Sequence, residues 1–273
     1  MSTENTRRLL LFLFIVTALS LAPMLSHAAV FWDDEMEEGN TEFSPNYMLS
    51  TMIPGGNMAY DTNVKFSGAG SLRYNYPSTC QNAAAPGVQV CGGWIDRTFP
   101  ETNEHFGRVY IRLPPDFKWG AVNGQTKIFG VRSTNGLSKL WFNFYFSLGM
   151  IVSAENTPNT GQTSNIPINT SMPREQWVCF EWHFINNNPA GTPNGTLQTW
   201  NNGVQTVLRN DIQWRGTGNT SVGWGLIRMY RQSGFGNIWF DRMAVGSTRI
   251  GCLKATSASD TTRPAPPQGL VIR

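Results

Sequence analysis

The segment FGRVYIRLP, residues 106–114, carries polar groups that could take part in chemistry. Its apolar and polar residues alternate strictly, which predicts a β-strand with one buried face. The polar face holds Arg108, Tyr110 and Arg112. Arginine binds carboxylate or sulfate groups through paired hydrogen bonds, and a phenol can transfer a proton. The segment therefore predicts a surface that binds an anionic ligand.

Three further runs show the same alternation: LWFNFYFS (140–147), WVCFEWHF (177–184) and IRMYRQ (227–232). Their polar faces contribute Trp141, Asn143, Tyr145, Glu181, His183, Arg228 and Tyr230. If the four strands lie side by side, these faces form one surface with the polar face of residues 106–114. Flat Tyr and Trp rings suit sugar rings, and Trp141 and Trp214 are the tryptophans that we expect to serve as sugar platforms.

This set of side chains suits β-elimination in a polysaccharide that contains uronic acids. We predict that Arg108 and Asn143 neutralise the sugar carboxylate, which makes the neighbouring C–H acidic. Tyr145 and His183 would then remove the proton and return one to the leaving oxygen. The predicted substrate-binding residues are Tyr110, Arg112, Trp141, Glu181, Arg228 and Tyr230.

Glycoside hydrolysis ranks below elimination because it usually needs two carboxylates that face one cleft. Glu181 has no carboxylate on its own face at positions 179 or 183, and no E-x-D-x-x-E run occurs in the chain. We therefore favour a polysaccharide lyase over a glycoside hydrolase, and whether the chain is an enzyme stays open.

Each of these residues also has a structural interpretation. Arg108 and Arg112 could form ion pairs with acids on neighbouring strands, and His183 could be a structural partner of Glu181. Two other function classes follow. The chain could be a non-catalytic glycan-binding or adhesion module, or a structural sandwich domain of a surface protein. A lyase needs a Tyr or His in the same pocket as an Arg and an Asn, whereas a binder needs only an aromatic groove.

The elements that must position these groups are short strands. The chain has 273 residues, of which 40% are hydrophobic and 14% charged, with 27 glycines and 16 prolines. At least ten apolar or alternating runs lie between turn signals, and NNG at 201–203 predicts a tight hairpin. We predict an all-β fold, a two-sheet antiparallel sandwich or jelly roll. A net charge of +3 gives no indication of a nucleic-acid partner.

The two ends of the chain differ from its middle. Residues 1–28 combine Arg7, Arg8, an apolar run and a small-x-small site that ends at Ala28, which predicts a secretory signal peptide. We expect a secreted, periplasmic or extracellular monomer with no membrane span after cleavage. Residues 29–256 form the predicted sandwich domain, and residues 257–273 form a Pro-rich tail or linker.

Four cysteines fit an oxidising compartment, and they are Cys80, Cys91, Cys179 and Cys252. Three pairings are possible. We favour Cys80–Cys91, which closes a short loop, and Cys179–Cys252, which ties a central strand to the end of the domain. A zinc site is the alternative, but the chain has no C-x-x-C pair.

Several phrases resemble concanavalin A-like jelly rolls, and among them polysaccharide lyases of the alginate lyase and heparinase kind. The phrases are GSLRY (70–74), FGRVYIRLP (106–114), EWHFINN followed by GTLQTWNNG (both within 181–203) and IWFDRMAVGSTRIGC (238–252). The Arg-Glu-Leu-Arg and Gln-x-His motifs of alginate lyases are absent. The resemblance implies a structural calcium ion held by an early Glu and a late Asp, which here match Glu37 and Asp241, and a solvated acidic edge is the alternative. It implies no other cofactor.

Overall fold

The computed structural model describes residues 30–36, 58–76, 92–118, 125–145, 149–154, 166–168, 172–221, 223–232 and 235–253. Within these residues the secondary structure is β-strand, in agreement with the all-β prediction. No helix there is long and apolar enough to span a membrane. The predicted signal peptide, the predicted tail, Glu37, Cys80 and Cys91 all lie outside the described residues.

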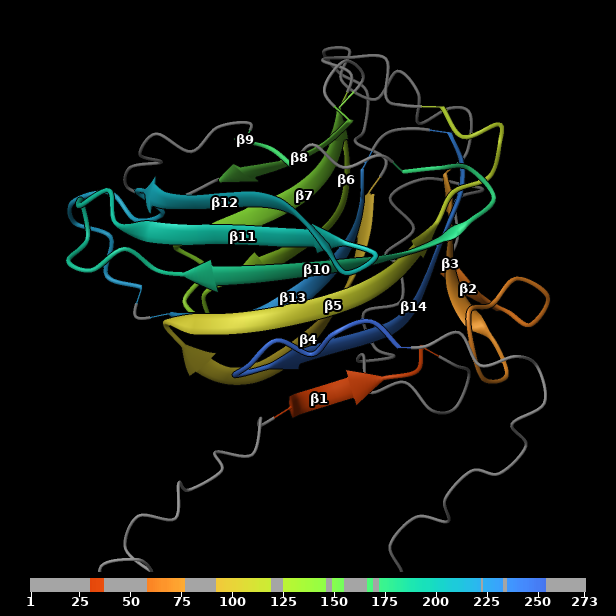
Figure 1. The fold of residues 1–273 in the computed structure, drawn as a ribbon, viewed down its shortest axis with the longest axis horizontal. Helices are drawn as coiled ribbons and strands as arrows, with labels where there is room; N and C mark the ends of the chain where they lie inside the picture. The colour runs from red at the N-terminus through yellow and green to blue at the C-terminus, as the bar shows by residue number, and fades with distance from the viewer. Residues whose placement is uncertain are drawn as a thin grey trace, which may run out of the picture.

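The strands form two antiparallel sheets, which we call sheet A and sheet B (Figure 1). Sheet A has the order β12-β11-β10-β5-β14-β3-β2, and β1 also pairs with β14. Its strands are β1 (Val30–Asp34), β2 (Met58–Asp61), β3 (Ser71–Tyr76), β5 (Glu104–Arg112), β10 (Trp177–Ile185), β11 (Gly195–Asn201), β12 (Val204–Ile212) and β14 (Gly236–Gly246). In Figure 1, β10, β11 and β12 lie in front of sheet B.

Sheet B has the order β4-β13-β6-β7-β8-β9. Its strands are β4 (Gly92–Thr102), β6 (Gln125–Arg132), β7 (Lys139–Tyr145), β8 (Gly149–Ala154), β9 (Ile166–Pro167) and β13 (Trp224–Gln232). The two-sheet antiparallel sandwich expected from the sequence is therefore confirmed.

The core lies between the sheets and is rich in aromatic rings. The alternation of β10 turns Phe180, Trp182 and Phe184 inward, and all three are fully buried. They contact Phe142 of β7 at ring-centroid distances of 5.2, 5.5 and 5.8 Å. Each buried aromatic side chain removes a large apolar area from water, so these contacts join the two sheets.

The predicted hairpin at residues 201–203 connects β11 to β12. Asn202 and Gly203 both have positive φ, 50° and 81°, as a tight two-residue hairpin turn requires. A Cβ atom on Gly203 would meet nothing within 4 Å, so the backbone conformation and not crowding favours glycine there. Asn202 Oδ1 also accepts a hydrogen bond from the Cys179 backbone N–H at 2.9 Å. The turn is thereby joined to β10.

His105 is a titratable residue inside the core, and it makes the stability of the fold depend on pH. It is fully buried, and its Nε2 accepts a hydrogen bond from Trp182 Nε1 at 3.2 Å. Burial lowers the pKa of His105 to about 3, because the apolar site disfavours the charged ring. The native state therefore holds this ring neutral under mild acid.

We expect acid to destabilise the fold through His105. Between pH 6.5 and about 3 the unfolded chain binds a proton at this ring and the folded chain does not. The free energy of unfolding should therefore fall with falling pH, by up to about 1.4 kcal/mol per unit from this group. Urea denaturation from pH 7 to pH 5 would measure the slope. The His105→Gln variant should show a shallower slope, and an unchanged slope would contradict this role.

Candidate functional site

The predicted site residues lie on two different sheets. Arg108, Tyr110 and Arg112 are on β5, and Glu181 and His183 are on β10, so these five belong to sheet A. The remaining predicted residues, Trp141, Asn143, Tyr145, Arg228 and Tyr230, belong to β7 and β13 of sheet B. The prediction of one joint surface is wrong, because the four strands are not neighbours in a single sheet. Strand alternation alone does not reveal which strands pair.

On sheet A, Arg108 is part of the structural framework. Its side chain is 1% exposed, and it donates to both carboxylate oxygens of Asp33 at 3.1 and 3.0 Å. It also donates to the backbone carbonyls of Arg242 and Gly251. The guanidinium thus joins β5 to β1, β14 and the segment that follows β14. Its donors are thus bound to protein groups, which agrees with the interpretation of Arg108 as a member of an ion pair.

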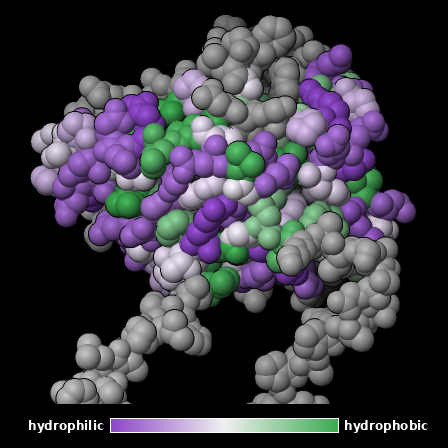
Figure 2. All heavy atoms as spheres, in the orientation of Figure 1, coloured by the Kyte–Doolittle hydropathy of each residue, from purple (hydrophilic) through white to green (hydrophobic). Residues whose placement is uncertain are grey.

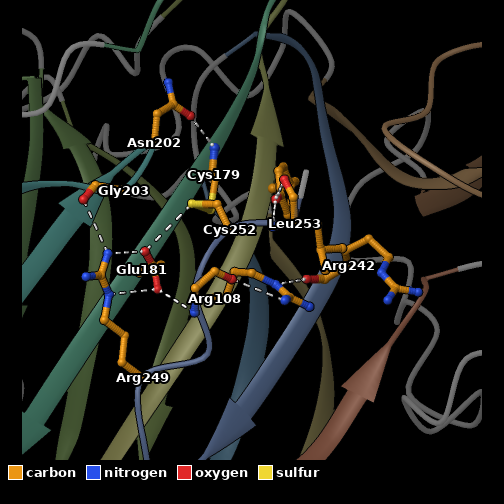
Figure 3. The surroundings of a disulfide bond; sticks show 11 residues. Arg108, Cys179, Glu181, Asn202, Gly203, Arg242, Arg249, Cys252 and Leu253 are labelled. Atoms are coloured by element: carbon orange, nitrogen blue, oxygen red, sulfur yellow. Dashed lines mark hydrogen bonds and ion pairs between the residues drawn. A yellow bond between two sulfur atoms is a disulfide. The ribbon is translucent and has the colours of Figure 1, made fainter. Parts of the chain in front are cut away.

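Glu181 and the disulfide hold the segment 249–253 across sheet A (Figure 3). Glu181 is 1% exposed and accepts from Arg249 at 3.2 and 2.8 Å and from the Gly251 N–H at 2.9 Å. Cys179, two residues before it on β10, is bonded to Cys252. The predicted Cys179–Cys252 pairing is confirmed, and both sulfurs are therefore unavailable to a metal.

Tyr110 is covered by the same segment. Its hydroxyl accepts from the Leu253 N–H at 2.6 Å and lies 3.2 Å from the Leu253 carbonyl, to which it donates. The ring of Phe66 stacks on it at 3.7 Å, and burial raises the pKa of the phenol. Tyr110 is 3% exposed, so its phenol is bound within the fold.

His183 and Arg112 also have partners within the fold. His183 Nε2 lies 2.8 Å from Glu104 Oε1, and its ring stacks on Phe106 at 3.9 Å. The sequence suggested Glu181 as its partner, whereas the structure places Glu104 there. Arg112 donates to the Glu175 carbonyl at 2.6 Å. Figure 2 shows the face over β5, β10 and β11 as mainly hydrophilic.

Replacing Arg108 by methionine should lower the free energy of unfolding by about 3 kcal/mol, because buried acceptors lose their donors. The matched control is Arg209→Met. Arg209 makes a paired contact with Asp211, but both side chains are about half exposed or more, so we expect a loss below about 1 kcal/mol. Urea denaturation measures both. Equal losses in the two variants would contradict the structural role of Arg108.

On sheet B, a group of aromatic and charged side chains lies on the outward face. Trp141 of β7 contacts Tyr230 of β13, with ring centroids 4.9 Å apart. The ammonium of Lys127, on the intervening strand β6, lies 4.9 Å from the centroid of the Trp141 ring. A cation over an aromatic face is a favourable contact. We call Lys127, Trp141, Asn143, Arg228 and Tyr230 the sheet B cluster.

Gly130 has no side chain, and this leaves room for the Trp141 ring of the cluster. A Cβ atom on Gly130 would come within 2.6 Å of Trp141 Cε3 and 2.9 Å of Cζ3, so the indole lies directly on the bare backbone of β6. Strand register then fixes the neighbours. Lys127 pairs with Asn143, and Gln125 pairs with Tyr145, which places Tyr145 at a position equivalent to Asn143 on β7.

Arg228 brings a second cation to this face, and its guanidinium is already paired. Its guanidinium donates to both oxygens of Asp96 on β4, at 2.7 and 2.5 Å. This pair is partly exposed and fixes the orientation of the guanidinium beside Tyr230. Sequence reasoning missed Lys127 and Asp96. The alternation of QTKIFGVRS places Lys127 on the polar face of its strand, which was the available signal.

Trp214 and Asp241, a predicted sugar platform and a predicted calcium ligand, are both buried in the structure. Trp214 is fully buried and donates its Nε1–H to the Thr196 carbonyl at 3.1 Å, so the prediction of a sugar platform there is wrong. Asp241 is fully buried beneath the loop that contains Phe66. Its Oδ2 accepts the Phe66 and Ser67 N–H groups at 2.7 and 3.3 Å. Burial raises the pKa of Asp241 to about 7.

The fold was compared with known proteins. The chain matches the endo-β-1,4-glucuronan lyase of the fungus Trichoderma reesei with a TM-score of 0.56 and 14% identity, covering 81% of this chain and 96% of the lyase. It also matches the cellulose-induced protein Cip1, with a TM-score of 0.50 and 18% identity over 81% and 99% of the two chains. The chain has the fold of a concanavalin A-like jelly roll.

This jelly roll resembles polysaccharide lyases in its fold. The globular domain of T. cruzi calreticulin also matches, with a TM-score of 0.50 and 9% identity over 81% of this chain and 88% of that domain. No protein-family model and no curated protein matches the sequence. Because the matching structures bear names of different kinds, the fold leaves the activity to be argued from the site.

Proposed function

We propose that this jelly roll binds an anionic polysaccharide on the outward face of sheet B and cleaves it by β-elimination. The observation that carries the proposal is the Lys127 ammonium held over Trp141, with Tyr230 packed against the same ring. A flat aromatic group beside a cation suits a sugar ring that bears a carboxylate. Sheet A offers no equivalent among its predicted residues, since Arg108, Tyr110 and Glu181 are buried and bonded.

In the proposed reaction, Lys127 neutralises the sugar carboxylate and stabilises the charge that develops when the adjacent C–H loses its proton. Tyr145 is proposed to take that proton as the phenolate and then, as the phenol so formed, to donate it to the leaving glycosidic oxygen. A carbon–carbon double bond forms in the sugar as the carbon–oxygen bond breaks, so water is not consumed. Arg108 and His183, which the sequence suggested for these steps, lie on the other sheet.

The test is an elimination assay on the full set of candidate polymers. Alginate, polyglucuronate, pectate, heparin and hyaluronan would each be mixed with the protein, and the ultraviolet absorbance of the unsaturated uronate product would be followed. A rise with one polymer, lost in Tyr145→Phe, is the expected result. A polymer that is retained by the immobilised protein but never cleaved would identify a glycan-binding module instead. No retention of any polymer would reject the proposal.

We also propose that the protein is exported and acts outside the cytoplasm. The Cys179–Cys252 disulfide supports this, because such bonds persist mainly in oxidising compartments. Cleavage after Ala28 would leave a mature chain that begins just before β1. Amino-terminal sequencing of the natural protein tests this directly, and an intact Met1 would reject it.

A structural calcium ion at Asp241 is a further part of the proposal. Asp241 Oδ1 is buried and accepts no hydrogen bond of good geometry within the described residues, which fits a cation ligand. We expect calcium to raise the melting temperature by several degrees, and EDTA to reverse this. The Asp241→Asn variant should lose the response. An identical melting temperature with calcium and with EDTA would rule the site out.

A further inference from the structure

Two buried polar atoms of β7, on the outward face of sheet B, have no hydrogen-bond partner within the described part of the chain. They are the indole Nε1 of Trp141 and the amide Oδ1 of Asn143. Trp141 is 5% exposed and Asn143 is fully buried. An unpaired buried donor or acceptor costs free energy, so each such atom in a native protein calls for an explanation. Here one is a donor, one is an acceptor, and they lie two residues apart on β7.

The orientation of the Asn143 amide is fixed by its neighbours. Its Nδ2 donates to Ser153 Oγ at 2.7 Å and to the Trp141 carbonyl at 3.1 Å. The reversed amide would set Oδ1 against the Trp141 carbonyl, and two acceptors would then face each other. The amide N–H groups are therefore committed to the protein, and Oδ1 is the atom left for a ligand. It can accept a hydrogen bond but cannot donate one.

The orientation of the Trp141 ring is fixed as well. The ring atoms nearest to Gly130 are Cε3 and Cζ3, and Cζ3 lies opposite Nε1 across the indole. Nε1 therefore points away from the backbone of β6. Tyr230 and Lys127 contact the same ring, and both are only partly buried. They form the rim beside the two unpaired atoms, and a bound sugar must displace part of this rim.

We propose that Trp141 Nε1 and Asn143 Oδ1 recognise neighbouring hydroxyl groups of the sugar residue that binds on sheet B. A hydroxyl can accept the hydrogen bond that Nε1 offers, and a hydroxyl can donate the bond that Oδ1 needs. A carboxylate could satisfy Nε1 but would be repelled by Oδ1. The pair therefore selects an unsubstituted diol, and this step rests on the proposed function of the sheet B cluster.

Lys127 places the carboxylate of the same sugar beside that diol. Strand register pairs Lys127 with Asn143, so its ammonium and the amide lie at adjacent positions of the sheet. A uronic acid residue carries its carboxylate and its free hydroxyls on one ring. In this arrangement Lys127 recognises the carboxylate of the substrate. Trp141 and Asn143 recognise its unsubstituted hydroxyl groups. The arrangement predicts that O-acetyl groups on the polymer weaken binding.

The test compares polyglucuronate that has free hydroxyls with O-acetylated polyglucuronate of equal length and charge. Calorimetric titration of the wild-type protein should show at least about tenfold weaker binding of the acetylated polymer, because two hydrogen bonds are lost. Trp141→Phe keeps a flat ring but removes the N–H. It should weaken binding of the free polymer about fivefold and leave binding of the acetylated polymer unchanged. Trp200→Phe on sheet A is the matched control and should preserve the discrimination.

The possible outcomes separate this inference from the proposed function. Equal affinity of the wild-type protein for both polymers would reject the hydroxyl subsite and leave the polysaccharide-binding face standing. Equal weakening of both polymers by Trp141→Phe would show that the ring stacks without reading hydroxyls, and would also reject the subsite. Failure of the wild-type protein to bind either form of polyglucuronate would reject the subsite, and the proposed function is rejected as well only if none of the five polymers is retained. The wild-type comparison needs no variant, so a folding defect cannot obscure the result.

Discussion

Replacing Lys127 by methionine should lower the rate of polymer cleavage by about 10² to 10³-fold. The ammonium is the one cation of the described residues that lies over the Trp141 ring, and in the proposed reaction it faces the developing negative charge. Loss of a single preorganised charge-stabilising group typically reduces turnover by this amount. Lys127→Arg keeps the charge and should retain a substantial part of the activity. Initial rates from product absorbance measure the effect.

The matched control for this prediction is Lys65→Met. Lys65 is an exposed lysine of the loop beside β2, and its Nζ donates to the Ala69 carbonyl at 3.4 Å. Its removal changes the net charge as much as Lys127→Met does, but on the side of sheet A. We expect less than a twofold change in rate. Comparable losses in the two variants would mean that overall charge, and not the sheet B cluster, controls the reaction.

Removing the Cys179–Cys252 bond should lower the free energy of unfolding by about 4 kcal/mol. The bond closes a loop with a sequence separation of 73 residues, and restricting the unfolded chain over that length is worth about this much. The double variant Cys179→Ala with Cys252→Ala removes the bond without leaving a reactive thiol. Urea denaturation under oxidising conditions compares it with the wild-type protein.

Other contacts around this bond should confine the effect of its removal to the free energy of unfolding and leave the folded structure unchanged. Cys252 belongs to the segment 249–253, which also contacts sheet A through the bonds of Glu181, Arg108 and Tyr110. Those contacts persist in the double variant and should hold the segment in place once the chain has folded. The variant should therefore fold to the same structure with lower stability. Unchanged stability would show that the bond adds nothing to these contacts.

Much of the fold follows from the alternation of residues along the chain. The inward faces of β7 and β10 were readable because Phe142, Phe144, Phe180, Trp182 and Phe184 recur at every second position. The turn at residues 201–203 was readable because Asn-Gly suits positive φ. These features depend on neighbours in the sequence, and local physical chemistry is sufficient to predict them.

The site was harder to predict, because it depends on which strands are neighbours in space. Arg108 and Trp141 look equally plausible as binding residues in the sequence, yet one is enclosed by Asp33 and the segment 249–253 and the other lies beside Lys127. Asp33 and Arg108 are 75 residues apart, and no periodic pattern links them. Long-range ion pairs and the order of strands in a sheet depend on the whole fold. The local patterns of a single sequence do not predict them.

The most direct test of the account is a crystal structure of the Tyr145→Phe variant with a tetrasaccharide of the polymer that the protein binds. The variant keeps Lys127 and the aromatic rings, and it should stop cleavage. We predict that a sugar ring lies against Trp141 and Tyr230, with its carboxylate at the Lys127 ammonium. A tetrasaccharide bound instead over β5 and β10, beside Arg112 and His183, would contradict the assignment of the binding face to sheet B.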